Sequence, residues 1–145
     1  MTIAMLVATV AAGLFAGAAM YVTVAEHPAR LEAGQAVAIE EFGPSYRRAA
    51  VMQGLLAAAG LLASVVAWYQ GYGVGWLVWG LLLGALVPFT LVVIMPTNRR
   101  LLDPGLDSGS GEARELLLRW GRLHAVRTLV GVAVFVAFVG MSLRS

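Results

Sequence analysis

The sequence has no cysteine and no lysine, and charged side chains make up 12% of its 145 residues. Without cysteine, disulfides, thiolate metal sites, thiol nucleophiles and redox motifs are excluded. All ten basic residues are arginine, and the formal net charge of +2 is too small to indicate a nucleic-acid partner. So few charges also exclude an ordinary soluble domain.

Hydrophobic residues make up 60% of the chain, and the mean hydropathy is +0.82. A helix needs roughly 20 apolar residues to cross a bilayer, so the chain has room for about four crossings. We predict an all-α fold, an antiparallel four-helix transmembrane bundle, as a single domain over residues 1–145. The predicted spans are 2–25, 49–69, 74–95 and 120–143.

Two more polar segments, 26–48 and 96–119, separate the spans. The first has the composition of a short amphipathic helix on the membrane surface, and 96–111 is rich in Gly, Pro, Asp and Ser, so we expect a mobile loop there. Whether either segment acts as a lid stays open. Pro88 falls inside the third span and predicts a kink, because its ring removes a helical hydrogen bond.

Charge is distributed unevenly between the two ends of the predicted bundle. Antiparallel crossings place both polar segments at one end, with the termini and the 70–73 turn at the other. All eight acidic residues and every arginine except Arg144 belong to the first end. Because arginine concentrates in cytoplasmic loops, we predict a bacterial-type inner (cytoplasmic) membrane protein with both termini outside and its polar site on the cytoplasmic side.

Trp120, His124 and Arg127 follow the spacing i, i+4, i+7, which places them on one face of the fourth helix as it enters the bilayer. An arginine at this depth normally faces a wet cavity or a partner, although snorkelling to lipid phosphates is an even alternative.

Glu26, His27 and Arg30 reach the same depth at the end of the first span. A Glu26 to Arg30 ion pair that finishes the helix is the simpler interpretation of the glutamate. The two histidines of the chain come from different spans to one interface, which favours a role in proton transfer.

Four further polar residues belong to the same end: Tyr46, Arg47, Gln53 and Asn98. Three of them also have an ordinary structural interpretation: Tyr46 as an interfacial aromatic, Arg47 as a topology signal and Asn98 as a helix cap. Gln53, two turns deeper than Tyr46 on the same face, suggests that polarity extends inward. A faint repeat relates 27–31 to 96–101 and suggests a duplicated pair of helices.

The chain resembles the anthrone oxygenase-like family of small membrane proteins along its whole length. The resemblance rests on Glu26-His27-Pro28-Ala29-Arg30, on Pro96-Thr97-Asn98, and on Trp120, His124 and Arg127 at their spacing. It implies oxidation of an anthrone methylene to a quinone with dioxygen. It also implies a candidate site made of His27, Arg30, Asn98, Trp120, His124 and Arg127.

The residue types fit this chemistry. Either histidine serves as general base for the acidic methylene, and Arg127, Arg30 and Asn98 hold the enolate oxygen. Trp120, Tyr46, Arg47 and Gln53 are the predicted substrate-binding residues. The expected partners are the lipid bilayer and an apolar aromatic small molecule, and a homo-oligomer is left open.

No cofactor is favoured, because an electron-rich enolate reacts with dioxygen directly. The alternative is a single iron or copper ion held by His27, His124 and either Glu41 or Glu26, since two histidines and a carboxylate form the facial triad of iron oxygenases. Two other functions compete with the oxygenase: a small transporter component and a structural or assembly protein without catalysis.

Overall fold

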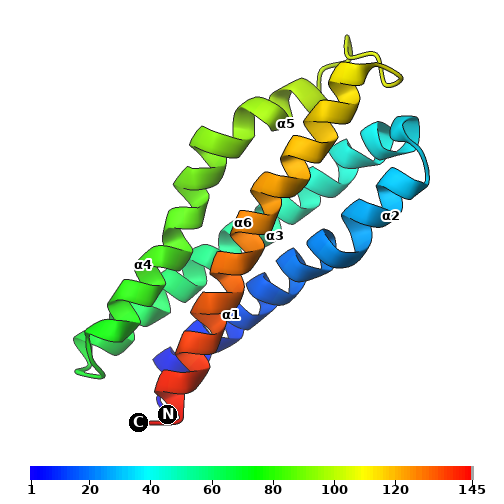
Figure 1. The fold of residues 1–145 in the computed structure, drawn as a ribbon. Coiled ribbons are helices and arrows are strands. Elements are labelled where there is room, and N and C mark those ends of the chain that lie inside the picture. The colour runs from blue at the N-terminus through cyan, green and yellow to red at the C-terminus, as the bar shows by residue number, and fades with distance from the viewer. Residues whose placement is uncertain (145) are drawn as a thin grey trace.

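Four long helical rods run side by side in the computed structural model, which describes residues 1–144 (Figure 1). Ser145, the last residue of the predicted domain, lies outside the described residues. The elements are α1 (Ile3–Tyr21), η1 (Val22–Glu26), α2 (His27–Glu32), α3 (Gln35–Tyr69), α4 (Val74–Phe89), η2 (Thr90–Ile94), α5 (Met95–Leu101) and α6 (Gly111–Ser142), where η marks a π-helix. The four rods are Ile3–Glu32, Gln35–Tyr69, Val74–Leu101 and Gly111–Ser142, and each is long and apolar enough to span a membrane. The chain is therefore an all-α integral membrane protein.

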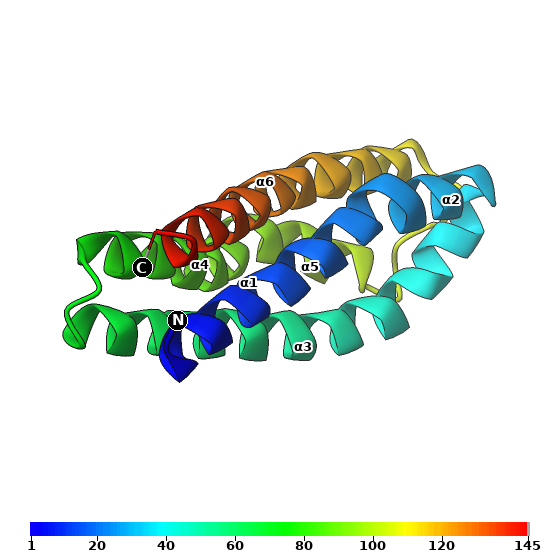
Figure 2. The same ribbon diagram turned by 90° about the horizontal axis from the view of Figure 1, so that it is seen from below.

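The rods alternate in direction, as the sequence predicts. The N-terminus, the end of α6 and the 70–73 turn lie at one end of the bundle, and the other two connections lie at the opposite end (Figures 1 and 2). Gly71 and Gly73 form the tight turn with φ of 89° and 100°, and Gly34 ends the first rod with φ of 115°. Positive φ favours glycine, so these residues fix where the chain reverses.

The rods are longer than the predicted spans. Segment 26–48 forms no separate surface helix, because its residues end the first rod and begin α3, with a break at Ala33 and Gly34. The expected loop at 96–111 begins as α5 and is irregular over 102–110. A rod of about 30 residues is roughly 45 Å long, more than the hydrocarbon thickness, so the rods project beyond the hydrocarbon.

Each of the first and third rods contains a π-helix near its polar end. The N–H of His27 bonds to the carbonyl of Val22, and the N–H of Met95 bonds to that of Thr90. Each of these residues is followed by a proline at the start of the next helix, where a missing N–H is tolerated. Pro88 lies inside α4, and η2 begins two residues after it, at Thr90; the kink expected at Pro88 stays a prediction.

Two apolar clusters hold the rods together. One lies towards the termini and includes the stacked rings of Trp76 and Phe138, whose centroids are 4.9 Å apart. The other lies at the polar end and includes Phe42, Leu117 and Trp120. Between them the packing is incomplete, and the polar side chains gather there.

Candidate functional site

A partly open cavity of about 140 Å³ lies between the two clusters, with a wall drawn from all four rods. Most of the wall is apolar, with contributions from Phe15, Leu86 and Ile94. Seven residues predicted for the site line this cavity: Arg30, Tyr46, Gln53, Asn98, Trp120, His124 and Arg127.

Arg127 is the cavity's uncompensated cation. Its Nη2 donates to Gln53 Oε1 at 2.8 Å, and its guanidinium lies 5.5 Å from the centre of the Phe15 ring. Its Nε is buried without a hydrogen-bond partner, and no carboxylate within residues 1–144 forms an ion pair with it. The side chain therefore points inwards and keeps N–H groups for a ligand.

A chain of hydroxyl groups fixes the proton on His124. Thr128 Oγ1 lies 3.1 Å from the carbonyl oxygen of Ala19 and 3.2 Å from that of His124. Carbonyl oxygens only accept, so the Thr128 hydroxyl donates to them and accepts from Thr23 Oγ1 at 2.7 Å. Thr23 has then used its one proton and accepts from His124 Nδ1 at 3.0 Å.

This assignment leaves Nε2 of His124 as a free acceptor. The ring proton sits on Nδ1, on the side of Thr23, and among the described residues the hydrogen bond of the ring is made through Nδ1, not Nε2. The imidazole is 5% exposed and lines the cavity beside Arg127. The ring thus lines the cavity and keeps one unpaired acceptor nitrogen, as a general base requires.

Asn98 adds a neutral polar group to the same wall. It is 1% exposed, and its Oδ1 has no hydrogen-bond partner within the described part of the chain. An unpaired buried amide is costly, and buried polar groups without partners are typical of ligand sites.

Arg30, in contrast, is neutralised. It is 6% exposed and forms ion pairs with Glu26 and, at 2.8 Å from Nε to Oε2, with Glu41. Ser45 joins the group by donating to Glu26 at 2.7 Å. The ion pair predicted between Glu26 and Arg30 is confirmed, and Glu41 adds a second carboxylate.

His27 lies outside the cavity. Its Nε2 donates to the carbonyl of Leu117 at 3.0 Å, and its ring centroid is 5.0 Å from that of Trp120. Gly121 makes this position available, because a Cβ there would lie 2.7 Å from His27 Nε2. The two histidines share an open groove on the outer side of Trp120, whereas His124 alone of the pair also lines the cavity.

Arg47 does not belong to the cavity wall either. It is exposed and lines a shallow surface groove beside Arg48. This position suits the topology signal that the sequence offered as the alternative to substrate binding.

The ligand set predicted for a metal ion is not assembled. Among residues 1–144, no three His, Asp or Glu side chains are placed to hold one metal ion. Glu26 and Glu41 contact Arg30, and the imidazoles of His27 and His124 both pack against Trp120. The four side chains do not fit the facial triad.

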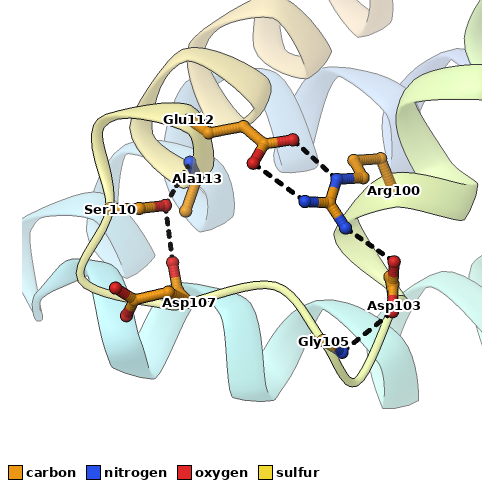
Figure 3. A network of polar contacts seen from close by, with 7 residues as sticks. All are labelled: Arg100, Asp103, Gly105, Asp107, Ser110, Glu112 and Ala113. Atoms are coloured by element: carbon orange, nitrogen blue, oxygen red, sulfur yellow. Dashed lines mark hydrogen bonds and ion pairs between the residues drawn. The ribbon is translucent and has the colours of Figure 1, made fainter.

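A network of polar contacts, here called the loop clamp, joins α5, the 102–110 loop and the start of α6 (Figure 3). Arg100 donates to Glu112 at 2.6 and 2.8 Å and to Asp103 at 2.6 Å. The Gly105 N–H and Arg100 hold the pKa of Asp103 below its usual range. Gln35 bonds to the carbonyls of Ser108 and Ser110, so the 102–110 loop is tied to both α3 and α6.

Several residues of the cavity wall have no signal in the sequence. Ala50, Gly54, Thr90 and Leu91 line it, yet small and apolar residues are common on every face of a transmembrane helix. The polar wall residues were recognisable because polar groups are rare at this depth.

Comparison with known proteins agrees with this architecture. The sequence profile of the family described as anthrone oxygenase matches residues 42–137. A curated relative, anthrone oxygenase tpcL of Aspergillus fumigatus, is 46% identical over 48 residues, a match that covers 31% of this chain and 30% of the relative. No solved structure matches significantly. The profile match spans most of α3 and α6 and all of the third rod between them, and on this ground the chain belongs to the anthrone oxygenase family.

Proposed function

We propose that the protein is a membrane-embedded oxygenase that oxidises the methylene of an apolar, anthrone-like aromatic with dioxygen. One observation carries the proposal: a histidine with a free Nε2 and an uncompensated arginine line the same apolar cavity. Membership of the anthrone oxygenase family supports the reaction class.

His124 is the proposed general base. The methylene of an anthrone is acidic because removal of its proton gives an aromatic enolate, and a neutral imidazole is strong enough to take that proton. Thr23 holds the Nδ1 proton in place, so Nε2 meets the substrate as an acceptor.

Arg127 and Asn98 are the proposed holders of the enolate oxygen. Arg127 Nε is a buried donor without a hydrogen-bond partner, and fixed donors act far more strongly in a water-poor wall than in water. The unpaired atom of Asn98 is the acceptor Oδ1, so its amide has to present Nδ2 to the enolate. Arg30 contributes less, because two carboxylates already contact it. Tyr46, Gln53 and Trp120 are the proposed wall against which the aromatic rings of the substrate lie.

The oxygen step needs no cofactor in this proposal. The electron-rich enolate carbon reacts with dioxygen and forms a C–O bond. One oxygen atom becomes the new carbonyl, and the other leaves as water with the two hydrogens of the methylene. The carbon is oxidised, and dioxygen is the electron acceptor.

The test uses protein reconstituted in phospholipid vesicles with anthrone and ¹⁸O₂. We expect quinone absorbance, with the label in the new carbonyl. His124→Ala and Arg127→Gln are each expected to lower the rate by about 10² or more, and Arg122→Gln, an exposed arginine of the same helix, serves as the matched control. Unchanged rates in both site variants would refute the proposed roles.

Metal analysis tests the cofactor-free step separately. We expect no stoichiometric iron or copper in active protein, and no difference in metal content between the wild type and His27→Ala/His124→Ala. Stoichiometric metal that the double variant loses would replace the enolate mechanism by a metal mechanism.

We also propose that the site faces the cytoplasm of an inner membrane, with both termini outside. The arginine distribution supports this orientation. Because the chain has no cysteine, single cysteines at Ser108 and Tyr72 can be tested with an impermeant thiol reagent in whole cells. We expect Tyr72→Cys to react and Ser108→Cys to be protected; the reverse pattern would invert the orientation.

A further inference from the structure

The two halves of the chain repeat the same local design. In the first and third rods a five-residue π-helix is followed by His27-Pro28 or Met95-Pro96, and Arg30 and Asn98 then occupy equivalent positions and both line the cavity. The faint repeat in the sequence therefore has a counterpart in the fold.

The second and fourth rods also correspond. Tyr46, Ala50, Gln53 and Gly54 of α3 follow the same spacing as Trp120, His124, Arg127 and Thr128 of α6. Tyr46 contacts Met95, with 3.6 Å between Oη and Sδ, just as Trp120 contacts His27. We call the line of contact between η1 and α6 a seam. The corresponding seam in the other half lies between η2 and α3.

The seam between η1 and α6 is closed. Thr23, His124 and Thr128 bridge it with hydrogen bonds of 2.7 and 3.0 Å, and Thr128 continues to the carbonyl of Ala19 at 3.1 Å. The groove outside this seam contains none of the arginine and amide groups of the cavity.

The counterpart seam is open. Leu91 stands where Thr23 stands in the first half, and Ala50 and Gly54 replace His124 and Thr128, so the hydrogen bonds have no equivalents. All three residues line the cavity, yet Leu91 is 58% exposed and Ala50 is also exposed. A Cβ added at Gly54 would meet nothing within 4 Å.

The surroundings of this opening are apolar. Val51, Leu55 and Val92 are 64%, 67% and 73% exposed. Arg47 and Arg48 lie one turn nearer the polar end and mark the level of the lipid headgroups. The opening therefore lies at the depth of the acyl chains.

We propose that the gap between α3 and η2, bounded by Ala50, Gly54 and Leu91, is a lateral portal through which a flat apolar aromatic passes from the bilayer into the cavity. The class of substrate rests on the proposed function. The cavity supports the portal by its size: a space of roughly 150 Å³ holds one benzene ring, so a three-ring substrate in a 140 Å³ cavity extends into the opening.

A reversible cross-link tests the portal in the intact protein. Ala50→Cys/Leu91→Cys is joined with a bifunctional methanethiosulfonate reagent and later released by reduction, in a chain with no other cysteine. The probe is 2-bromonaphthalene in phosphatidylcholine vesicles, which quenches tryptophan on contact, and Trp120→Phe identifies the signal from the cavity. Cross-linking is expected to slow quenching of Trp120 by roughly tenfold or more, and reduction to restore it.

Two controls separate the portal from general rigidity. Tyr69→Cys/Val74→Cys joins α3 to α4 at the far end and should leave the quenching rate unchanged. Ala50→Phe should slow quenching without any reagent, whereas Ala59→Phe, exposed on the opposite face of α3, should not.

The outcomes distinguish this inference from the proposed function. Equal quenching rates before and after cross-linking, or no quenching of Trp120 in any form, would overturn the portal. Slowed quenching in a protein that oxidises no anthrone would keep the portal and reject the oxygenase. If the protein oxidises anthrone at the same rate with and without the cross-link, the oxygenase is kept and the portal is rejected.

Discussion

Arg127 and Gln53 join α6 to α3 across the cavity through a 2.8 Å hydrogen bond, and the guanidinium has no carboxylate partner among residues 1–144. Arg30, on the other side of the site, has two. The bundle therefore keeps one of its two inward-facing arginines positively charged towards a ligand and neutralises the other.

Replacing the amide by a carboxylate should remove that positive charge. In Gln53→Glu, Arg127 gains an ion pair, so we expect the bundle to keep its stability while anthrone oxidation falls by about 10²-fold, because the enolate loses its counter-charge. Steady-state rates and thermal unfolding measure the two effects. Gln70→Glu, at the exposed turn, is the control, and a Gln53→Glu enzyme with full activity would show that Arg127 does not hold the enolate.

Thr23→Val should separate positioning from packing. The substitution keeps the shape but removes the acceptor for the Nδ1 proton of His124, so both ring tautomers become populated and the rate should fall at least about tenfold. Nitrogen-15 NMR of the imidazole reports the tautomer directly. If the spectrum and the rate stay as in the wild type, the hydroxyl chain does not set the proton position.

Gly80→Ala should destabilise the bundle, because a Cβ at this position would overlap the Ser64 side chain on α3. We expect a loss of about 1–3 kcal/mol in the free energy of unfolding in mixed micelles. Gly17→Ala is the matched control, since nothing lies within 4 Å of its added Cβ, and should cost no stability. If Gly80→Ala costs no more stability than Gly17→Ala, α3 and α4 can move apart far enough to accommodate the added Cβ.

The loop clamp should resist moderate acid. The pKa of Asp103 lies below its usual range because Gly105 and Arg100 favour the carboxylate, so its contribution is complete above about pH 4 and is lost only below that. Hydrogen exchange over residues 102–110 should therefore be similar at about pH 5 and pH 7 after correction for intrinsic rates. Arg100→Gln should raise exchange at both pH values; protection that survives the substitution would assign the order to Gln35 and Leu106 instead.

The fold follows closely from composition, and the four-rod architecture is confirmed. The rods exceed the predicted spans because the limits were placed where hydrophobicity ends, whereas a helix continues until its backbone meets a breaker. Gly34 and the 102–110 loop supply those breaks, and the charged residues before them do not.

The site residues could be predicted from the sequence where polar side chains are rare, inside the membrane spans. Trp120, His124 and Arg127 share one face by their spacing, and the structure brings them to one cavity. His27 lies three residues from Arg30, yet it is turned towards α6 because Gly121 leaves room for its ring. The catalytic roles of these residues stay predictions.

The portal was beyond the reach of the sequence for a different reason. Ala50, Gly54 and Leu91 have the same character as residues that simply face lipid, and their significance appears when they are compared with Thr23, His124 and Thr128 in the other half. That comparison requires the arrangement of the rods.

The two π-helices set which way the polar ends of their rods face. A π-turn contains one residue more than an α-turn, so the residues after it lie about 100° from where an unbroken α-helix over the same sequence would place them. Without these turns, Arg30 and Asn98 would face away from the interior, towards lipid. Deleting one residue from 90–94 would let the turn relax to regular α-helix and keep Asn98 in the wall, whereas a regular stretch of helix has no spare residue to lose.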